Sequence, residues 1–183
     1  MNMQSFADIA FTPTVKALQE DAGSRASYAR MEESPAGSLG PREWAFLAER
    51  DSFYMASVSE TGWPYVQHRG GPAGFLKVLD GNTVGFADFR GNKQYVSTGN
   101  LMNDDRVSLI LVDYPNRQRL KLLGHVRLVG AEEPVVLEKL VRPDYRARVE
   151  RGFLIDIAAL DWNCPQHITP RYTLDEIAAA RTS

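Results

Sequence analysis

Seven short apolar runs, broken by turn-forming residues, follow one another from Phe53 to Leu160 and constrain the fold more than any other feature. The intervening turns include Glu60-Thr61-Gly62, Asp80-Gly81-Asn82 and Pro115-Asn116-Arg117. Apolar runs of this length, bounded by Gly, Pro, Asn and Asp, are typical of antiparallel strands joined by tight turns. The pattern predicts a mainly β fold, a meander that forms a small closed or split barrel with peripheral helices. The runs are FYMASV, PYVQHR, FLKVL, TVGFAD, VSLILVDY, RLKLLGHVRLV and RGFLIDIAAL.

Helix signals lie mostly outside these runs. Cap residues, prolines at a first helical position and a capping box predict helices that begin near Thr12, Pro41, Asn92, Pro134 and Thr173. Residues 1–43 are therefore predicted to be a helical extension packed on the barrel, and residues 44–183 the barrel itself, within one structural domain. A bend is expected at Gly124, in the sixth apolar run.

Composition indicates an ordinary globular protein without a general affinity for polyanions. The 183 residues are 44% hydrophobic and 24% charged, and the formal net charge is −2. This length suits one core, and a slightly acidic chain argues against nucleic acid as a partner. The densest basic run, residues 142–151, contains Asp144 and Glu150 between its arginines and is interpreted as a solvated helix face.

Cysteine usage and hydropathy point to the cytoplasm and away from a membrane. Cys164 is the only cysteine, so an intrachain disulfide is impossible. No apolar run approaches the 18 or so residues that a membrane-spanning helix needs, and the N-terminal residues do not resemble a secretory leader. We therefore expect a cytoplasmic protein.

Residues 83–101, TVGFADFRGNKQYVSTGNL, carry the clearest sign of a ligand site. A strand there ends in a glycine-punctuated basic turn that is predicted to continue as a helix. Free N–H groups in a first helical turn attract anions, Gly91 permits close approach, and Lys93 adds a full charge. Asn92 and Gln94 can donate amide hydrogens to further oxygens. A phosphate site is one interpretation, and an ordinary strand-to-helix connection with a solvated lysine is the other.

Two common phosphate-binding motifs are excluded. The P-loop needs four residues between its glycines and a lysine directly after the second, but five residues separate Gly85 from Gly91, and Asn92 precedes Lys93. The GGPAG stretch at residues 70–74 has neither the spacing nor the helix of a dinucleotide fingerprint. A P-loop or Rossmann frame is not expected.

Two further segments offer polar side chains to a ligand. In the run PYVQHR, neighbouring side chains point in opposite directions, and Arg69 is a better anion ligand than His68 because its guanidinium is always charged and binds phosphate through two hydrogen bonds. His68 is interpreted equally well as an ordinary surface or core histidine.

The second segment, DWNCPQHI, combines Trp162 with the amides of Asn163 and Gln166, a mixture that suits a flat heteroaromatic ring. Cys164 and His167 lack metal-ligand spacing, so no metal site is predicted. No hydrolase triad or paired-carboxylate motif is present either. Catalytic residues therefore stay unassigned, and any chemistry is expected to belong to a cofactor.

Four segments in this order resemble the pyridoxamine 5′-phosphate oxidase-like FMN-binding split-barrel family, in particular its bacterial flavin-nucleotide-binding branch. The similarity extends roughly from Trp44 to Tyr172. It implies an antiparallel split barrel that forms a homodimer with two FMN molecules at the subunit interface. The segments are PYVQHRGGPAGFLKVL, GFADFRGNKQYVSTGNL, DYPNRQRLKLLGHVRLV and DWNCPQHITPRY.

The resemblance also implies positions for the cofactor. It places the strand that carries Arg69 and the basic turn around Lys93 at the FMN phosphate, Arg119 opposite the flavin, and Trp162 near its ring. The predicted cofactor-binding residues are His68, Arg69, Gly70, Phe89, Gly91, Asn92, Lys93, Gln94, Arg119, Trp162, Asn163 and Gln166.

Departures from the family pattern argue against vitamin B6 oxidation itself. The oxidases have Ser-Arg-Lys in the phosphate turn where this chain has residues 91–93, Gly-Asn-Lys, so Arg90 is a candidate for the missing cation. The late Arg-x-His of the oxidases falls on His167 and Thr169. The expected function is an FMN-dependent oxidoreductase that transfers hydride between flavin and a small organic substrate or nicotinamide donor. The alternatives are a non-catalytic module that binds or stores flavin, haem or deazaflavin, and a structural dimer with an empty barrel.

Overall fold

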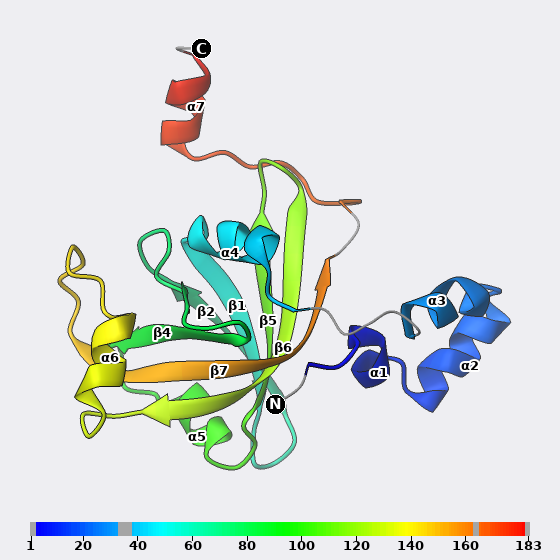
Figure 1. The fold of residues 1–183 in the computed structure, drawn as a ribbon, viewed down its shortest axis with the longest axis horizontal. Coiled ribbons are helices and arrows are strands. Elements are labelled where there is room, and N and C mark those ends of the chain that lie inside the picture. Colours follow the sequence, from blue (N-terminus) through cyan, green and yellow to red (C-terminus); the bar gives the residue numbers. More distant parts are fainter. Residues whose placement is uncertain (1–2, 33–37, 163–164, 182–183) are drawn as a thin grey trace.

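A seven-stranded antiparallel sheet with the strand order β2-β1-β5-β6-β7-β4-β3 forms the centre of the molecule (Figure 1). The computed structural model describes residues 3–32, 38–162 and 165–181. The sheet curls around its core, so the predicted mainly β, antiparallel split barrel is confirmed. The strands are β1 (Ser52–Val58), β2 (Pro64–Gly70), β3 (Lys77–Val78), β4 (Thr83–Phe89), β5 (Arg106–Asp113), β6 (Gln118–Val129) and β7 (Val149–Trp162).

Alternate side chains of these strands fill the interior of the barrel. On β1, Phe53 and Met55 are buried while Tyr54 between them is exposed, as the period of two of a half-buried strand requires. Three phenylalanines form the centre of the core. Phe86 stacks on Phe153 with ring centroids 4.8 Å apart and meets Phe53 edge to face at 5.3 Å. Packing of this core holds β1, β4 and β7 in place, and with them the end of β4.

The predicted bend of β6 at Gly124 is confirmed. The pairing of β6 with β7 shifts register between Leu123 and Gly124. A Cβ atom at Gly124 would lie 2.7 Å from the carbonyl oxygen of Asp156, so the two strands approach there more closely than a side chain permits. This shift lets the long pair of strands wrap around the core.

Four predicted helices are confirmed, and a fifth begins later than expected. The helix predicted from Asn92 begins only at Val96, and the apolar run FLKVL forms a strand only at Lys77–Val78. Two short N-terminal helices are not predicted, because neither has the proline in its first turn that marks three of the others. The helices are α1 (Phe6–Ala10), α2 (Pro13–Asp21), α3 (Arg25–Glu32), α4 (Pro41–Ala48), α5 (Val96–Leu101), α6 (Pro134–Leu140) and α7 (Leu174–Ala180).

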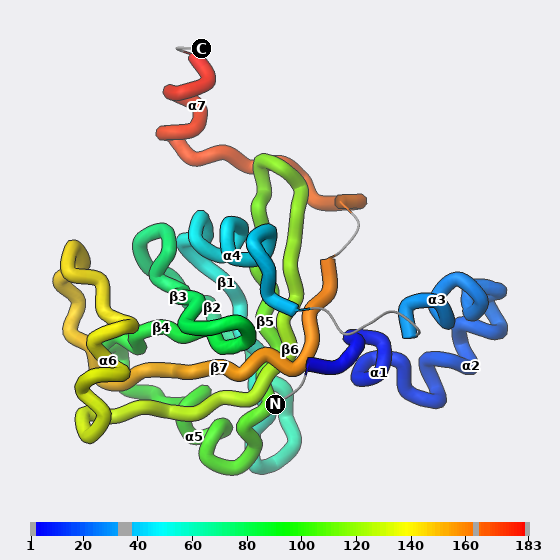
Figure 2. Tube along the Cα trace, in the orientation of Figure 1, coloured from blue at the N-terminus to red at the C-terminus, as the bar shows by residue number. Residues whose placement is uncertain are grey.

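The N-terminal helices meet the barrel through α1. Ala7 of α1 is buried, and the Gln4 N–H donates a hydrogen bond to the Ala158 carbonyl of β7 at 2.7 Å. Helices α2 and α3 pack on each other and project away from the sheet (Figure 2). Leu47 of α4 belongs to the barrel core, so the predicted boundary at residue 43 falls within α4. No helix among the described residues is long and apolar enough to cross a membrane.

Candidate functional site

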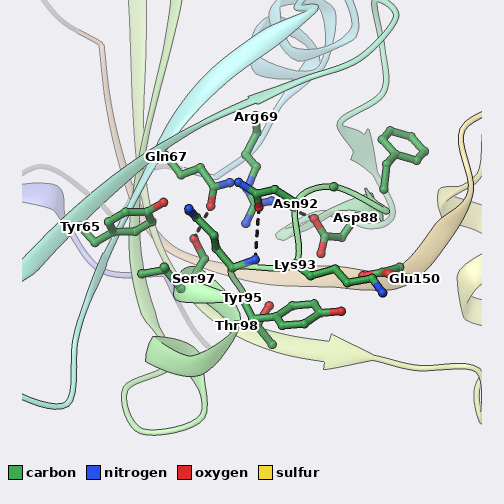
Figure 3. Close-up of a pocket in the computed structure, with 14 residues that line it drawn as sticks. Tyr65, Gln67, Arg69, Asp88, Asn92, Lys93, Tyr95, Ser97, Thr98 and Glu150 are labelled. Atoms are coloured by element: carbon green, nitrogen blue, oxygen red, sulfur yellow. Dashed lines mark hydrogen bonds and ion pairs between the residues drawn. The ribbon is translucent and has the colours of Figure 1, made fainter.

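A polar hollow lies between β2, the end of β4 and the loop that leads into α5 (Figure 3). We call it the basic pocket. Strand β2 contributes Tyr65, Gln67 and Arg69, which share one face because side chains alternate along a strand. The volume is about 80 Å³, which suits a compact group such as a phosphate, since whole small-molecule sites occupy roughly 300–1,000 Å³. The lining residues are Tyr65, Gln67, Arg69, Asp88, Phe89, Gly91, Asn92, Lys93, Gln94, Tyr95, Val96, Ser97, Thr98 and Glu150.

The loop before α5 has an unusual backbone. Lys93 and Tyr95 adopt positive φ angles of 61° and 53°, in the left-handed region that residues other than glycine rarely enter. The Asn92 side chain accepts a hydrogen bond from the Gln94 N–H at 3.2 Å and holds the turn. The expectation that a helix begins at Asn92 is wrong, because these conformations delay the helix to Val96. The first-turn amides of a helix therefore do not belong to residues 92–94.

Helix α5 is fixed to the barrel by two side-chain hydrogen bonds. Ser97 donates to the Gln67 side-chain oxygen at 2.8 Å, and Asn100 donates to Ser57 on β1 at 3.0 Å. Ser97, Asn100 and Ser57 are buried, where such bonds matter most because the alternative is an unsatisfied polar group. These contacts hold the loop with Lys93 opposite β2.

The inner wall of the basic pocket is a cluster of ions. Arg69 donates to Asp88 at 2.8 Å, and the Arg151 Nε atom lies 3.4 Å from the other oxygen of the same carboxylate. Arg151 also contacts Glu150 at 3.2 Å and Thr98 at 3.4 Å. The side chains of Arg69 and Asp88 are only 12% and 14% exposed, so this pair is largely withdrawn from water.

Aromatic rings support both guanidinium groups. Arg69 lies over the Phe153 ring at 5.1 Å and over Phe86 at 5.7 Å, and Arg151 lies over Tyr95 at 4.9 Å. Cation–π attraction adds about 0.5–2 kcal/mol at such sites. The hydrophobic core therefore ends in a floor that orients the cations of the basic pocket.

Burial disturbs the ionisation of both partners in the central pair. Desolvation raises the pKa of Asp88 above its usual range, although the positive charges of Arg69 and Arg151 oppose the shift. Desolvation likewise lowers the pKa of Arg69, against the opposing influence of Asp88. The Nε atoms of Arg69 and Arg151 are buried without a hydrogen-bond acceptor. Since the Arg151 Nε atom still lies 3.4 Å from the Asp88 carboxylate, Arg69 is the cation whose Nε atom the protein leaves without an acceptor.

The structure brings one half of the predicted site residues together. Six of them line the basic pocket, whereas His68 and Gly70 line a neighbouring hollow that also reaches Arg69. A Cβ atom on Gly91 would meet nothing closer than the Phe89 carbonyl oxygen at 4.0 Å, so this glycine does not mark a close approach within the chain. The six are Arg69, Phe89, Gly91, Asn92, Lys93 and Gln94.

Three more of the predicted residues lie elsewhere in the chain, and a fourth falls outside the described residues. Trp162 ends β7, twelve residues beyond Glu150, which corresponds to roughly 40 Å along an extended strand. Its indole donates to Glu43 at 2.7 Å and meets Phe46 edge to face, so within one chain it fastens α4 to the barrel. Arg119 belongs to the same region, because its neighbour on β6 pairs with Trp162. Gln166 is exposed, and Asn163 lies outside the described residues.

Sequence reasoning missed several residues of the basic pocket. The interpretation of residues 142–151 as a solvated helix face is wrong for Arg151, because it lies on β7 and contacts the pocket residue Asp88. The alternation along β2 that marks Arg69 also marks Gln67 and Tyr65, so this signal was available in the sequence. Asp88 and Glu150 gave no signal, since they become neighbours only when β4 pairs with β7. Among the described residues, no cluster of three or more His, Cys, Asp or Glu side chains could hold a metal ion.

Comparison with known proteins agrees with this architecture. HupZ from Group A Streptococcus superposes with a TM-score of 0.53 at 13% identity, over 73% of this chain and 99% of HupZ. A Clostridium acetobutylicum protein related to general stress protein 26, of the pyridoxinephosphate oxidase family, gives a TM-score of 0.50 at 13% identity over 73% and 92% of the two chains. No curated protein sequence matches. The family model for pyridoxamine 5′-phosphate oxidase matches residues 41–156, more than half of the sequence, and the chain therefore belongs to that family.

Proposed function

We propose that this chain is an FMN-binding flavoprotein whose basic pocket holds the 5′-phosphate of the cofactor. The observation that carries the proposal is that Arg69 and Lys93 line one small hollow, where the buried Nε atom of Arg69 lacks an acceptor. Arg151 contacts three of the lining residues, Asp88, Glu150 and Thr98. Guanidinium and ammonium groups are the side chains that bind phosphate most strongly. Membership of the pyridoxamine 5′-phosphate oxidase family supports a flavin as the bearer of that phosphate.

The residues of this chain would divide the work of binding. Arg69 and Lys93 would neutralise the phosphate, while Asn92 and Gln94 would complete its hydrogen bonds. When bound, FMN would supply the hydride chemistry of an oxidoreductase acting on a small organic substrate or nicotinamide donor. The protein would orient the cofactor, and no side chain is assigned as a general acid or base.

A homodimer would complete the site. The basic pocket is too small for the whole cofactor, and one chain keeps Trp162 and Arg119 at the far end of the sheet. Strands β1 and β2 present an uncovered apolar face that includes Tyr54, Val58 and Val66, which are 43%, 37% and 60% exposed. Apolar faces of this kind mark interaction surfaces. A second copy seated there is the arrangement we propose for bringing the two halves of the site together.

Lys93→Ala tests the phosphate contact. We expect FMN affinity to fall by about 1–3 kcal/mol, the scale of a lost charge-assisted hydrogen bond, and riboflavin affinity to change little. Fluorescence titration of apoprotein with both ligands measures the difference, with Lys139→Ala on α6 as an exposed control. Equal FMN affinity for wild type and Lys93→Ala would remove Lys93 from the site.

Optical spectra and turnover separate the remaining functions. Purified protein with bound FMN should absorb near about 450 nm, whereas a band near about 400 nm would indicate haem instead. Steady-state oxidation of NADH or NADPH by the yellow protein would distinguish an oxidoreductase from a flavin carrier. Colourless protein that binds none of these cofactors would leave only a structural role.

Val66→Glu tests the proposed dimer. A charge in the centre of an apolar interface must be desolvated without a partner, so we expect the dimer dissociation constant to rise at least 100-fold, about 2.7 kcal/mol. Val135→Glu on α6 is the matched control, because Val135 is 68% exposed and lies outside β1 and β2. Sedimentation velocity measures both variants. A dimer that persists in Val66→Glu would move the interface to another face.

A further inference from the structure

The basic pocket is not built as a purely cationic site. Its wall contains two carboxylates, Asp88 and Glu150, beside the cations Arg69 and Lys93. Both carboxylates also contact Arg151. A carboxylate near a bound phosphate repels it, so each of them weakens the binding of an anion. Their presence needs an explanation beyond charge attraction.

Asp88 occupies a hydrogen-bond donor of Arg69, the guanidinium that lines the pocket, and lies close to Arg151. One of its oxygens accepts from Arg69 at 2.8 Å, and the other lies 3.4 Å from Arg151. Figure 3 shows the carboxylate beside the Arg69 guanidinium at the pocket wall. Glu150 is placed further out, against Arg151 at 3.2 Å and Arg90 at 4.0 Å. Asp88 is therefore the carboxylate with the more direct influence on the two buried cations.

We infer that Asp88 is a specificity-determining residue of the basic pocket, whose carboxylate competes with the ligand's phosphate for Arg69 and Arg151. The competition lowers the preference of the pocket for a phosphorylated ligand over the same ligand without phosphate. This inference rests on the proposed function, since it concerns the same pocket. As a consequence, the pocket binds FMN less tightly than its cations would bind it without the Asp88 carboxylate.

Asp88→Asn isolates this effect because it changes charge with little change in shape. The asparagine side-chain oxygen can still accept from Arg69, and Arg151 keeps Thr98 and the Tyr95 ring as supports. Removing one negative charge from a largely buried wall strengthens attraction for phosphate by at least tenfold, because at an effective dielectric constant of about 20 even unit charges about 12 Å apart interact by that much. Riboflavin carries no phosphate, so its affinity should be the same for Asp88→Asn and wild type.

The experiment compares FMN with riboflavin. Apoproteins of wild type, Asp88→Asn, Glu150→Gln and Asp175→Asn are titrated with both ligands, and the ratio of the two dissociation constants is the readout. We expect the preference for FMN to rise at least tenfold in Asp88→Asn and by less in Glu150→Gln. Asp175, exposed on α7, serves as the control for loss of one negative charge and should leave the ratio unchanged.

A ratio that stays constant or falls in Asp88→Asn overturns the inference, as does equal tightening of both ligands. If Asp88→Asn does not fold, the ratio in Asp88→Ser, which also removes the negative charge, decides in the same way. Inorganic phosphate provides an arm without flavin, since the increase in apoprotein melting temperature with added phosphate should be larger in the carboxylate variants than in wild type. Failure of wild type to bind FMN would refute the proposed function alone, and the phosphate arm would then decide about Asp88.

Discussion

Arg69→Ala is expected to destabilise the folded protein by about 3–5 kcal/mol and to abolish the preference for a phosphorylated ligand. The substitution leaves the largely buried Asp88 with only the longer 3.4 Å contact to Arg151, and loss of one partner from a buried ion pair costs far more than a surface contact is worth. It also removes a cation from the aromatic floor formed by Phe86 and Phe153. The loss of stability and the loss of phosphate preference come from one side chain, because the Arg69 guanidinium packs on the core phenylalanines and also lines the pocket.

Urea denaturation of apoprotein measures the stability change, with Arg127→Ala as a matched control. Arg127 pairs with Glu133 at 2.5 Å, but its side chain is 55% exposed, and surface pairs contribute about 0–1 kcal/mol. The double variant Arg69→Ala/Asp88→Asn should regain part of the loss, because it removes the unpaired charge. A double variant no more stable than Arg69→Ala would show that the destabilisation does not come from Asp88.

The pH dependence of the same variant provides an independent check. Burial already raises the pKa of Asp88, and loss of Arg69 removes an opposing charge, so the pKa rises further. The folded protein then binds this proton more tightly than the unfolded chain does. The loss of unfolding free energy in Arg69→Ala, relative to wild type, is therefore largest above the raised pKa of Asp88. It becomes smaller as the pH falls through that pKa. A deficit that is constant with pH would contradict this origin.

The buried ions show how the fold is adapted to a site. A pair whose two pKa values are both shifted by desolvation contributes little net stability, and well-packed apolar residues at the same positions often do better. Left-handed Lys93 and Tyr95 add further cost in the adjoining loop. Such costs concentrated in one hollow are characteristic of functional sites, where local preferences give way to ligand binding.

The sequence was sufficient for the strands and for the basic turn, because both are local. Apolar runs between turn residues located all seven strands, and Gly124 marked the bend. The start of α5 could not be predicted, because the left-handed conformations of Lys93 and Tyr95 follow from packing against β2 through Ser97 and Gln67 rather than from residue preference. Local patterns thus reveal elements better than they reveal irregular loops.

The composition of the basic pocket depends on contacts between distant segments. Asp88 pairs with Arg151 across β4 and β7, and Gln67 meets Ser97 thirty residues further along the chain. No local pattern reports such pairings. Trp162 also depends on distant contacts, because within one chain its indole donates to Glu43, and its place beside the flavin stays a prediction. The sequence alone indicates residue types that suit a flavin, but it does not indicate which of them lie together in the fold.

Phe153→Ala is expected to lower the free energy of unfolding by about 3–5 kcal/mol, the range for truncation of a large aromatic side chain in a core. Phe153 is fully buried, stacks on Phe86 and supports Arg69 at 5.1 Å. Phe11→Ala is the matched control, since Phe11 contacts Tyr28 in the N-terminal extension and is only partly buried.

The two functions of Phe153 can be separated by Phe153→Leu. Leucine restores much of the lost apolar volume but offers no aromatic face, so stability should recover by more than half while the preference for FMN over riboflavin stays reduced about twofold to fivefold, the scale of a lost cation–π contact. Thermal denaturation and paired titrations with the two flavins measure these quantities on the same samples. Full recovery of both the stability and the preference for FMN would mean that Phe153 acts by its volume alone. Arg69 would then be oriented by Asp88 without help from the Phe153 ring.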